Sequence, residues 1–160
     1  MPRKDASSHS TVRQRLGNFG EDYVVCYLNC PVCLGEKPHS LLPPNTPCVD
    51  VICRSCNLQS QVKTISTGPN KSLPKTVLGG SWVPKQKSLI AGNFSPYFFI
   101  LVEDKEVIRI YYLPSSKQKL SIFKVRKPLS SKAKSPGWTG YQLDLRSIEK
   151  DLVEIPLKNN

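Results

Sequence analysis

The stretch VDVICRSCNLQSQVK, residues 49–63, predicts the hairpin on which the fold depends, because its C-x-x-C pair stands at the junction of two strand-forming runs. The pattern of apolar residues predicts one strand over residues 48–53 and a second over residues 58–65. The intervening residues 54–57 are then the turn of an antiparallel hairpin. We expect this hairpin to position the polar side chains that its two strands carry.

The cysteines of this turn have a matching pair earlier in the chain. Cys53 and Cys56 form one C-x-x-C group, and Cys30 and Cys33 form another, separated from the first by nineteen residues. In a structural zinc site four thiolates bind one ion tetrahedrally, and each C-x-x-C turn brings two of them together. The sequence therefore predicts a pair of zinc knuckles. Redox-active or simply buried thiols are the alternative, but they leave the second pair unexplained.

The compartment is predicted from the lack of apolar targeting segments in the sequence. The N-terminal stretch MPRKDASSHSTVRQR is polar and basic, and no run is long enough to suggest a signal peptide or a membrane span. A cytoplasmic protein is expected, and in that compartment cysteines stay reduced and available to zinc. We expect Cys26 and Cys48 to be buried free thiols, with Cys48 as a substitute zinc ligand.

Three polar side chains of the hairpin are expected to converge. With residues 54–57 as the turn, Asp50 lies opposite Gln61, and Lys63 follows on the same face. Carboxylate and amide oxygens bind Mg²⁺, which lowers the pKa of a bound water, while an ammonium stabilises the charge that develops on a phosphate. An Asp, a second oxygen ligand and a Lys two residues later form the pattern of the PD-(D/E)xK nucleases. The predicted reaction is phosphodiester hydrolysis.

Two features of this pattern leave alternatives open. Most such nucleases carry a carboxylate where this chain has Gln61, and a neutral oxygen holds Mg²⁺ less strongly. A solvated strand face would also carry the same residue types without any catalytic role. On the first predicted helix, Glu21 is a candidate for orienting a metal-bound water, with an ordinary exposed charge as the alternative.

The charge distribution favours a nucleic acid as the partner. The net charge is +11, and residues 51–102 and 107–143 contain no Asp or Glu. Surfaces without carboxylates can lie against phosphates without like-charge repulsion. A solvated basic surface is the alternative. The candidate DNA-binding cations of the second segment are Lys124, Arg126, Lys127, Lys132 and Lys134.

The rest of the chain predicts a single α+β domain over residues 12–160, after a disordered arm over residues 1–11. Its central mixed sheet is expected to be flanked by helices. The predicted elements are a helix over 12–28, loops over 37–47 and 68–80, a short helix or irregular segment over 82–91, a hairpin of strands 97–102 and 107–113, and a strand over 141–145.

A series of motifs resembles the DpnI-type, Dam-replacing family of restriction endonucleases, over about residues 18–147. RKPL and GWTG are more specific than a C-x-x-C pair alone. The resemblance implies a PD-(D/E)xK catalytic domain that contains a zinc site. The motifs are CPVC (30–33), VDVICRSC (49–56), QVK (61–63), PYFFIL (96–101), YLP (112–114), RKPL (126–129), PGWTG (136–140) and LDL (143–145).

The resemblance also implies an activity and a substrate. Members of this family cleave double-stranded DNA at a short site that contains N6-methyladenine, such as methylated GATC. Their catalytic and magnesium-binding positions fall on Asp50, Gln61 and Lys63, and their contact with the methylated base falls on Trp138. An indole between flanking glycines can present its apolar face to methyl groups in the major groove. Packing of Trp138 in the core is the alternative.

Some questions of function stay open at this point. The best-known members carry a winged-helix domain after the catalytic domain, for which residues 12–160 leave no room, so we expect a homodimer or a separate DNA-reading partner to contribute to specificity. A structure-specific or non-specific nuclease of the same fold is a second hypothesis. A zinc-stabilised DNA reader, in which Gln61 marks a lost active site, is a third. The family suggests a prokaryotic or phage origin.

Overall fold

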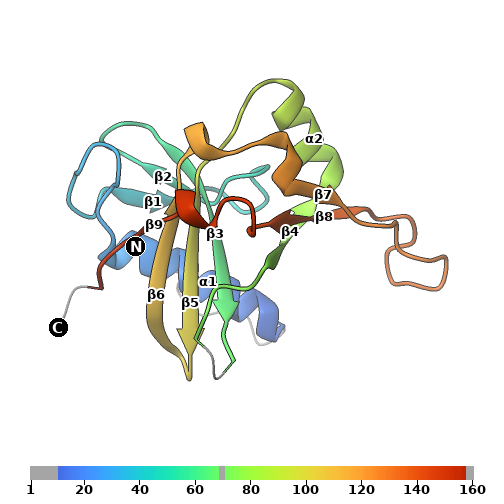
Figure 1. Ribbon diagram of the computed structural model, residues 1–160, viewed down its shortest axis with the longest axis horizontal. Coiled ribbons are helices and arrows are strands. Elements are labelled where there is room, and N and C mark those ends of the chain that lie inside the picture. The colour runs from blue at the N-terminus through green and yellow to red at the C-terminus, as the bar shows by residue number, and fades with distance from the viewer. Residues whose placement is uncertain (1–10, 69–70, 158–160) are drawn as a thin grey trace.

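The computed structural model describes residues 11–68 and 71–157 (Figure 1). Its centre is β5 (Tyr97–Glu103), a continuous apolar run that lies between β3 (Gln59–Ser66) and β6 (Glu106–Leu113). β5 runs parallel to β3 and antiparallel to β6. Three short strands complete a six-stranded sheet of order β1-β2-β3-β5-β6-β9. They are β1 (His39–Leu41), β2 (Val51–Cys53) and β9 (Val153–Glu154). The predicted mixed sheet of an α+β protein is confirmed.

One face of this sheet is covered by α1 (Val12–Tyr27), which ends one residue before the predicted end at residue 28. Thr11 and Gln14 form a capping box at its start, whereas residues 1–10 of the predicted arm lie outside the described part of the chain. The helix packs mainly on β3 and on β1. Among the residues buried in this layer are Val24, Val25, Val51, Val62, Phe98, Ile100 and Ile110.

The opposite face is covered mainly by a second, three-stranded sheet of order β4-β8-β7. It consists of β4 (Thr76–Ser81), β7 (Phe123–Val125) and β8 (Gly140–Asp144), and α2 (Trp82–Ile90) packs beside it. Helices therefore flank the central sheet as predicted, but on this face a sheet shares the covering role. The second core includes Val77, Leu89, Tyr97, Phe99, Leu101, Leu113, Ile122, Phe123, Tyr141 and Leu143.

The connections of the second sheet include three short 3-10 turns, at Ser115–Lys117, Leu120–Ile122 and Glu149–Asp151. Within residues 11–68 and 71–157, neither α-helix has the length and apolar character needed to cross a membrane.

Three predicted boundaries were wrong. The expected loop over 68–80 contains β4, because β8 supplies the hydrogen-bond partner that its glycine-rich sequence needs. The expected loop over 37–47 contains β1, which pairs with β2. The strand expected over 48–53 begins only at Val51, since Cys48 has a left-handed backbone with φ of 63°.

Candidate functional site

The two C-x-x-C turns meet at one end of the central sheet. The four Sγ atoms lie within 4.8 Å of one another, with 3.8 Å between those of Cys30 and Cys56 and 3.7 Å between those of Cys33 and Cys53. Sulfurs at about 2.3 Å from a tetrahedral ion lie about 3.8 Å apart, whereas a disulfide bond needs about 2.05 Å. The predicted cluster of four cysteines is confirmed, and its geometry fits a metal such as zinc.

Backbone hydrogen bonds shape both turns. The Leu34 N–H donates to Cys30 O at 3.0 Å, and the Asn57 N–H donates to Cys53 O at 2.8 Å. Burial raises the pKa of Cys30 to about 12. Burial also opposes ionisation of Cys53, but hydrogen bonds from the backbone and side chain of Cys56 lower the pKa of that thiol to about 7. The two turns therefore prearrange sulfurs of unequal acidity around one point.

The remaining cysteines lie outside this cluster. Cys26 on α1 and Cys48 before β2 are both partly exposed, so the expectation that they are buried was wrong. Burial raises the pKa of Cys48, while the charges of Lys85 and Lys63 act in the opposite direction. Cys48 is therefore a neighbour of the lysines on β3 and α2 and not a fifth member of the metal site.

Asp50 lies beside Gln61 at the point where β2 begins. β2 and β3 pair in the predicted register, with Val51 opposite Ser60. The Asp50 N–H donates to Ser60 O at 2.9 Å, and Oδ2 of Asp50 accepts from the Val62 N–H at 2.8 Å. These bonds lie on either side of Gln61 in the sequence of β3. The hairpin therefore holds the carboxylate next to residue 61.

The Lys63 side chain connects β3 to the second sheet. Its Nζ donates to Gly79 O on β4 at 3.1 Å. Burial lowers the pKa of Lys63, while the negative charges of Asp50 and Glu21 act in the opposite direction. Both carboxylates are therefore close enough to interact with the ammonium, although they belong to different elements.

Glu21 reaches this region because α1 approaches β3 very closely. A Cβ atom on Gly20 would lie 1.8 Å from Oγ1 of Thr64, so only glycine permits the contact. The close approach places Glu21, the next residue of the helix, near enough for its negative charge to interact with Lys63. The fold thus gathers all four candidate catalytic residues in one region.

The Gln61 side chain is buried, with 8% of its surface exposed. Among the described residues, its Oε1 has no hydrogen-bond donor. Burial raises the pKa of Tyr141 to about 12, and hydrogen bonds with Tyr97 and Gln61 act against that increase. A buried amide oxygen beside a carboxylate is a donor set that suits Mg²⁺. The residues present therefore fit a hard divalent cation.

Sequence reasoning missed a second lysine near this region. Lys85 on α2 is fully buried, and within the described residues its Nζ has no hydrogen-bond partner. The Nζ lies 5.0 Å from the ring centre of Tyr97, 4.9 Å from that of Phe123 and 6.0 Å from that of Tyr141. Cation–π attraction offsets part of the cost of its burial. Helical spacing in the sequence could have identified this lysine, since Lys85 falls on the apolar face of α2.

All the candidate DNA-binding residues except Lys124 lie on a projecting segment, residues 126–139, which we name the basic loop (Figure 1). The Arg126 N–H donates to Gly140 O and the Leu129 N–H donates to Trp138 O, both at 2.9 Å, so the loop is tied at its base. Trp138 is 41% exposed, which excludes the core-packing alternative. The exposed cations of this region are Lys124 on β7 and Arg126, Lys127, Lys132 and Lys134 on the basic loop.

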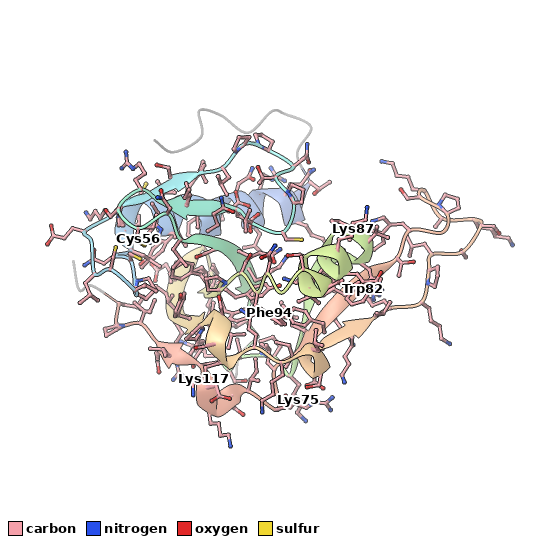
Figure 2. The ribbon with its side chains drawn as sticks, turned by 90° about the horizontal axis from the view of Figure 1, so that it is seen from above. Cys56, Lys75, Trp82, Lys87, Phe94 and Lys117 are labelled. Carbon is pink, nitrogen blue, oxygen red and sulfur yellow. The ribbon has the colours of Figure 1, made fainter. Side chains whose placement is uncertain are left out.

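The metal site and the basic loop lie on opposite sides of the molecule. The Trp82 N–H donates to Thr139 O at 2.9 Å, so Trp82 marks the root of the basic loop. Figure 2 shows Trp82 and Cys56 on opposite sides, with the central sheet between them. The cysteine cluster is therefore not part of the surface that the basic loop presents.

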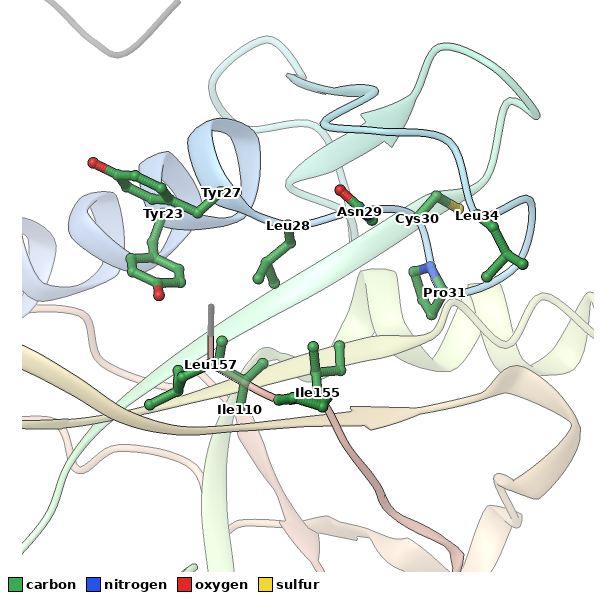
Figure 3. Close-up of a pocket in the computed structure, with 11 residues that line it drawn as sticks. Tyr23, Tyr27, Leu28, Asn29, Cys30, Pro31, Leu34, Ile110, Ile155 and Leu157 are labelled. Carbon is green, nitrogen blue, oxygen red and sulfur yellow. The ribbon is translucent and has the colours of Figure 1, made fainter. Parts of the chain in front are cut away.

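A separate apolar hollow lies between the end of α1 and the C-terminal segment (Figure 3). Its lining residues include no Asp, Glu, His, Lys or Arg, so it does not suit phosphodiester chemistry. Its apolar wall includes Tyr23, Tyr27, Leu34, Ile110, Ile155 and Leu157. The region around Asp50 and Lys63 is the better candidate active site.

Comparison with known families identifies the family of this chain. The family model described as DpnI, the Dam-replacing family, matches residues 4–157. The matched range contains both C-x-x-C turns, the β2–β3 hairpin and the basic loop. The chain therefore belongs to the Dam-replacing family.

Proposed function

We propose that this protein is a Mg²⁺-dependent DNA endonuclease with a PD-(D/E)xK active site formed by Asp50, Gln61 and Lys63. The observation that carries the proposal is the convergence of a carboxylate, a buried amide oxygen and a partly buried ammonium on the β2–β3 hairpin. Membership of the Dam-replacing family supports a restriction-type nuclease. The reaction is hydrolysis of a phosphodiester bond.

Each residue has a separate role in this proposal. Asp50 and Oε1 of Gln61 would hold the Mg²⁺ ion, which neutralises charge and activates water when it is bound. The Lys63 ammonium stabilises the negative charge that develops on the phosphate. Glu21 orients the attacking water from the side of α1. The four cysteines hold a structural Zn²⁺ ion, which joins the end of α1 to the hairpin.

The proposed substrate is double-stranded DNA with N6-methyladenine in a GATC-like site. The exposed cations of the basic loop contact phosphates, and the exposed ring of Trp138 offers an apolar face to the methyl group. A homodimer or a separate DNA-reading partner would add base contacts that a single loop cannot supply. The family also supports a prokaryotic or phage origin. The proposed compartment is the cytoplasm.

A plasmid digest tests this proposal. Fully methylated, hemimethylated and unmethylated plasmids of one sequence are incubated with the protein and Mg²⁺, and the products are separated on a gel. We expect cleavage of the methylated plasmid, its loss in Lys63→Ala, and weaker preference for methylated DNA in Trp138→Ala. Equal cleavage of all three plasmids would refute the methyl specificity, and no cleavage of any DNA would refute the nuclease.

A zinc-stabilised DNA reader is the second candidate function, and the amide at Gln61 is the observation that favours it. A neutral ligand reduces the affinity of the site for Mg²⁺. Tight binding of methylated DNA without products, even at high Mg²⁺, would support the reader. Cleavage of branched DNA in preference to linear DNA would instead support a structure-specific nuclease.

A further inference from the structure

The pairing of β4 with β8 is interrupted next to the candidate active site. Regular pairing stops after Leu78 and resumes at Ser81. In this gap β4 has two residues, Gly79 and Gly80, whereas β8 has only Tyr141. An extra residue on one strand is a β-bulge, which redirects the backbone groups of that strand. We call residues 79–80 the glycine bulge.

The glycine bulge is packed against a buried aromatic ring. A Cβ atom on Gly79 would lie 2.2, 2.3 and 2.5 Å from three carbon atoms of the Tyr141 ring, whereas a Cβ on Gly80 would meet nothing within 4 Å. Tyr141 is 2% exposed, and its hydroxyl lies 3.3 Å from that of Tyr97. The ring is therefore buried in the core, and it packs directly against the backbone of Gly79.

The carbonyl that this bulge presents is the one that binds Lys63. The Lys63 Nζ donates to Gly79 O at 3.1 Å. A free lysine side chain samples many rotamers, so its ammonium has a defined position only where such a bond holds it. Because the Tyr141 ring packs on Gly79, this carbonyl cannot turn away without displacing a core residue.

We propose that Gly79 is a positioning residue for Lys63, with the Tyr141 ring as the support that holds the glycine bulge in place. The inference rests on the proposed nuclease function, in which Lys63 faces the reacting phosphate. It assigns the second sheet a role in catalysis, in addition to covering the core.

Two neighbouring glycines provide a matched test. Gly79→Ala places a methyl group against the Tyr141 ring, whereas Gly80→Ala places the same group in open space. Neither glycine has a positive φ, so alanine is compatible with both backbones. We expect Gly79→Ala to lower kcat for DNA cleavage by about a hundredfold, with KM changed by less than about twofold, because the ammonium is displaced while DNA binding is retained. Gly80→Ala should cleave like the unaltered protein.

A second pair of variants covers the case in which Gly79→Ala does not fold. Tyr141→Phe keeps the supporting ring, and Tyr141→Leu removes it. Both variants lose the hydroxyl that hydrogen-bonds with Gln61, so they are compared with each other. We expect kcat to be higher in the Phe variant, which retains the ring, than in the Leu variant, with circular dichroism spectra that show both proteins folded. Equal kcat values in these two variants, or equal losses in the two glycine variants, would overturn the proposal.

A measurement without DNA separates this proposal from the nuclease function. The Lys63 side-chain NMR signal, assigned with Lys63→Arg, should report an ordered ammonium in the unaltered protein and in Gly80→Ala, and a mobile one in Gly79→Ala or Tyr141→Leu. If the protein cuts no DNA but shows this NMR pattern, the proposed nuclease function is refuted and the positioning of Lys63 by Gly79 is retained. If the protein cleaves DNA but the Lys63 side chain is equally mobile in all variants, only the positioning of Lys63 by Gly79 is refuted.

Discussion

At position 61 the protein carries an amide where a carboxylate would attract a divalent cation more strongly. Gln61 lies beside Asp50, and the positive charge of Lys63 is close to the same carboxylate. Asp50 is the one carboxylate of the two proposed Mg²⁺ ligands, and the nearby ammonium of Lys63 offsets part of its negative charge. We therefore expect the proposed enzyme to need a high Mg²⁺ concentration.

Gln61→Glu should lower this requirement. The variant adds one negative charge at a position that already has the right oxygen, so the Mg²⁺ concentration for half-maximal cleavage should fall roughly tenfold. Initial cleavage rates measured against Mg²⁺ concentration give this value. Gln61→Met, which removes the oxygen and keeps the size, is the control and should need more Mg²⁺. An unchanged requirement in Gln61→Glu would show that residue 61 does not bind the ion.

Lys85 is a buried residue whose positive charge lowers the free energy of unfolding. Burial lowers the pKa of Lys85 to about 8 from an ordinary value of 10.5, with the charge of Cys48 acting against this shift and that of Lys63 adding to it. Between these two pH values the unfolded chain binds more protons than the folded protein. The free energy of unfolding therefore rises with pH over this window, by about 3 kcal/mol for a difference of this size.

Lys85→Met should remove this pH dependence. At pH 7 the folded protein holds a charged ammonium in its core, so the Met variant should be more stable by up to about 3 kcal/mol. Its advantage should shrink as the pH rises from about 8 toward 10, because the folded lysine becomes neutral. Urea unfolding at pH 7 and pH 9.5 measures both effects, and Lys87→Met, an exposed lysine of the same helix, is the control. A Met variant that is less stable at pH 7 would contradict this account.

At the scale of elements, the contact of α1 with β3 determines whether Glu21 reaches the site. The helix contains two glycines with opposite surroundings. A Cβ on Gly20 would collide with Thr64, while a Cβ on Gly17 would meet nothing within 4 Å. Gly17 is thus a weak point of the helix without a packing reason, whereas Gly20 is required by the close approach.

Alanine at these two positions should have opposite effects. Gly20→Ala should lower the free energy of unfolding by about 2 kcal/mol through overpacking. Gly17→Ala should raise it by up to about 1 kcal/mol, because alanine favours the helix. Thermal unfolding followed by circular dichroism compares the two, and Thr64→Ala combined with Gly20→Ala should recover part of the loss. Equal stabilities would show that α1 can shift away from β3 at no cost.

At the scale of the whole molecule, the cysteine cluster joins segments that are far apart in the sequence. Cys30 and Cys33 follow α1, whereas Cys53 ends β2 and Cys56 lies in the turn that connects β2 to β3. The same hairpin carries Asp50 and the backbone that positions it. A metal ion at the cluster would therefore stabilise the proposed active site as well as the fold.

Removal of this metal should abolish cleavage. A chelator strong enough to strip Zn²⁺ should disorder the hairpin, and Mg²⁺ added afterwards should not restore activity, whereas Zn²⁺ should. Metal content and cleavage are measured on the same samples. Cys56→Ser should behave like the stripped protein, while Cys26→Ser, outside the cluster, should keep both metal and activity. Full activity at zero zinc content would show that the active site does not depend on the zinc knuckles.

Features that depend on residues close to one another along the chain could be predicted from the sequence. The helical period identified α1, the apolar runs identified the β5–β6 hairpin, and the two C-x-x-C spacings identified the four cysteines. The register that holds Asp50 beside Gln61 followed from the length of a single turn. Such features are local, because most of the interactions that determine them are made within a turn and its flanking residues.

Features that depend on residues remote from one another in the sequence could not be predicted and are seen only in the folded protein. β4 forms from a glycine-rich stretch because β8, about sixty residues later, provides its hydrogen bonds. Lys63 is bound by the carbonyl of Gly79, and Lys85 is buried by rings from β5, β7 and β8. Propensity and spacing carry no information about such contacts, because each one exists only after the two sheets have packed together.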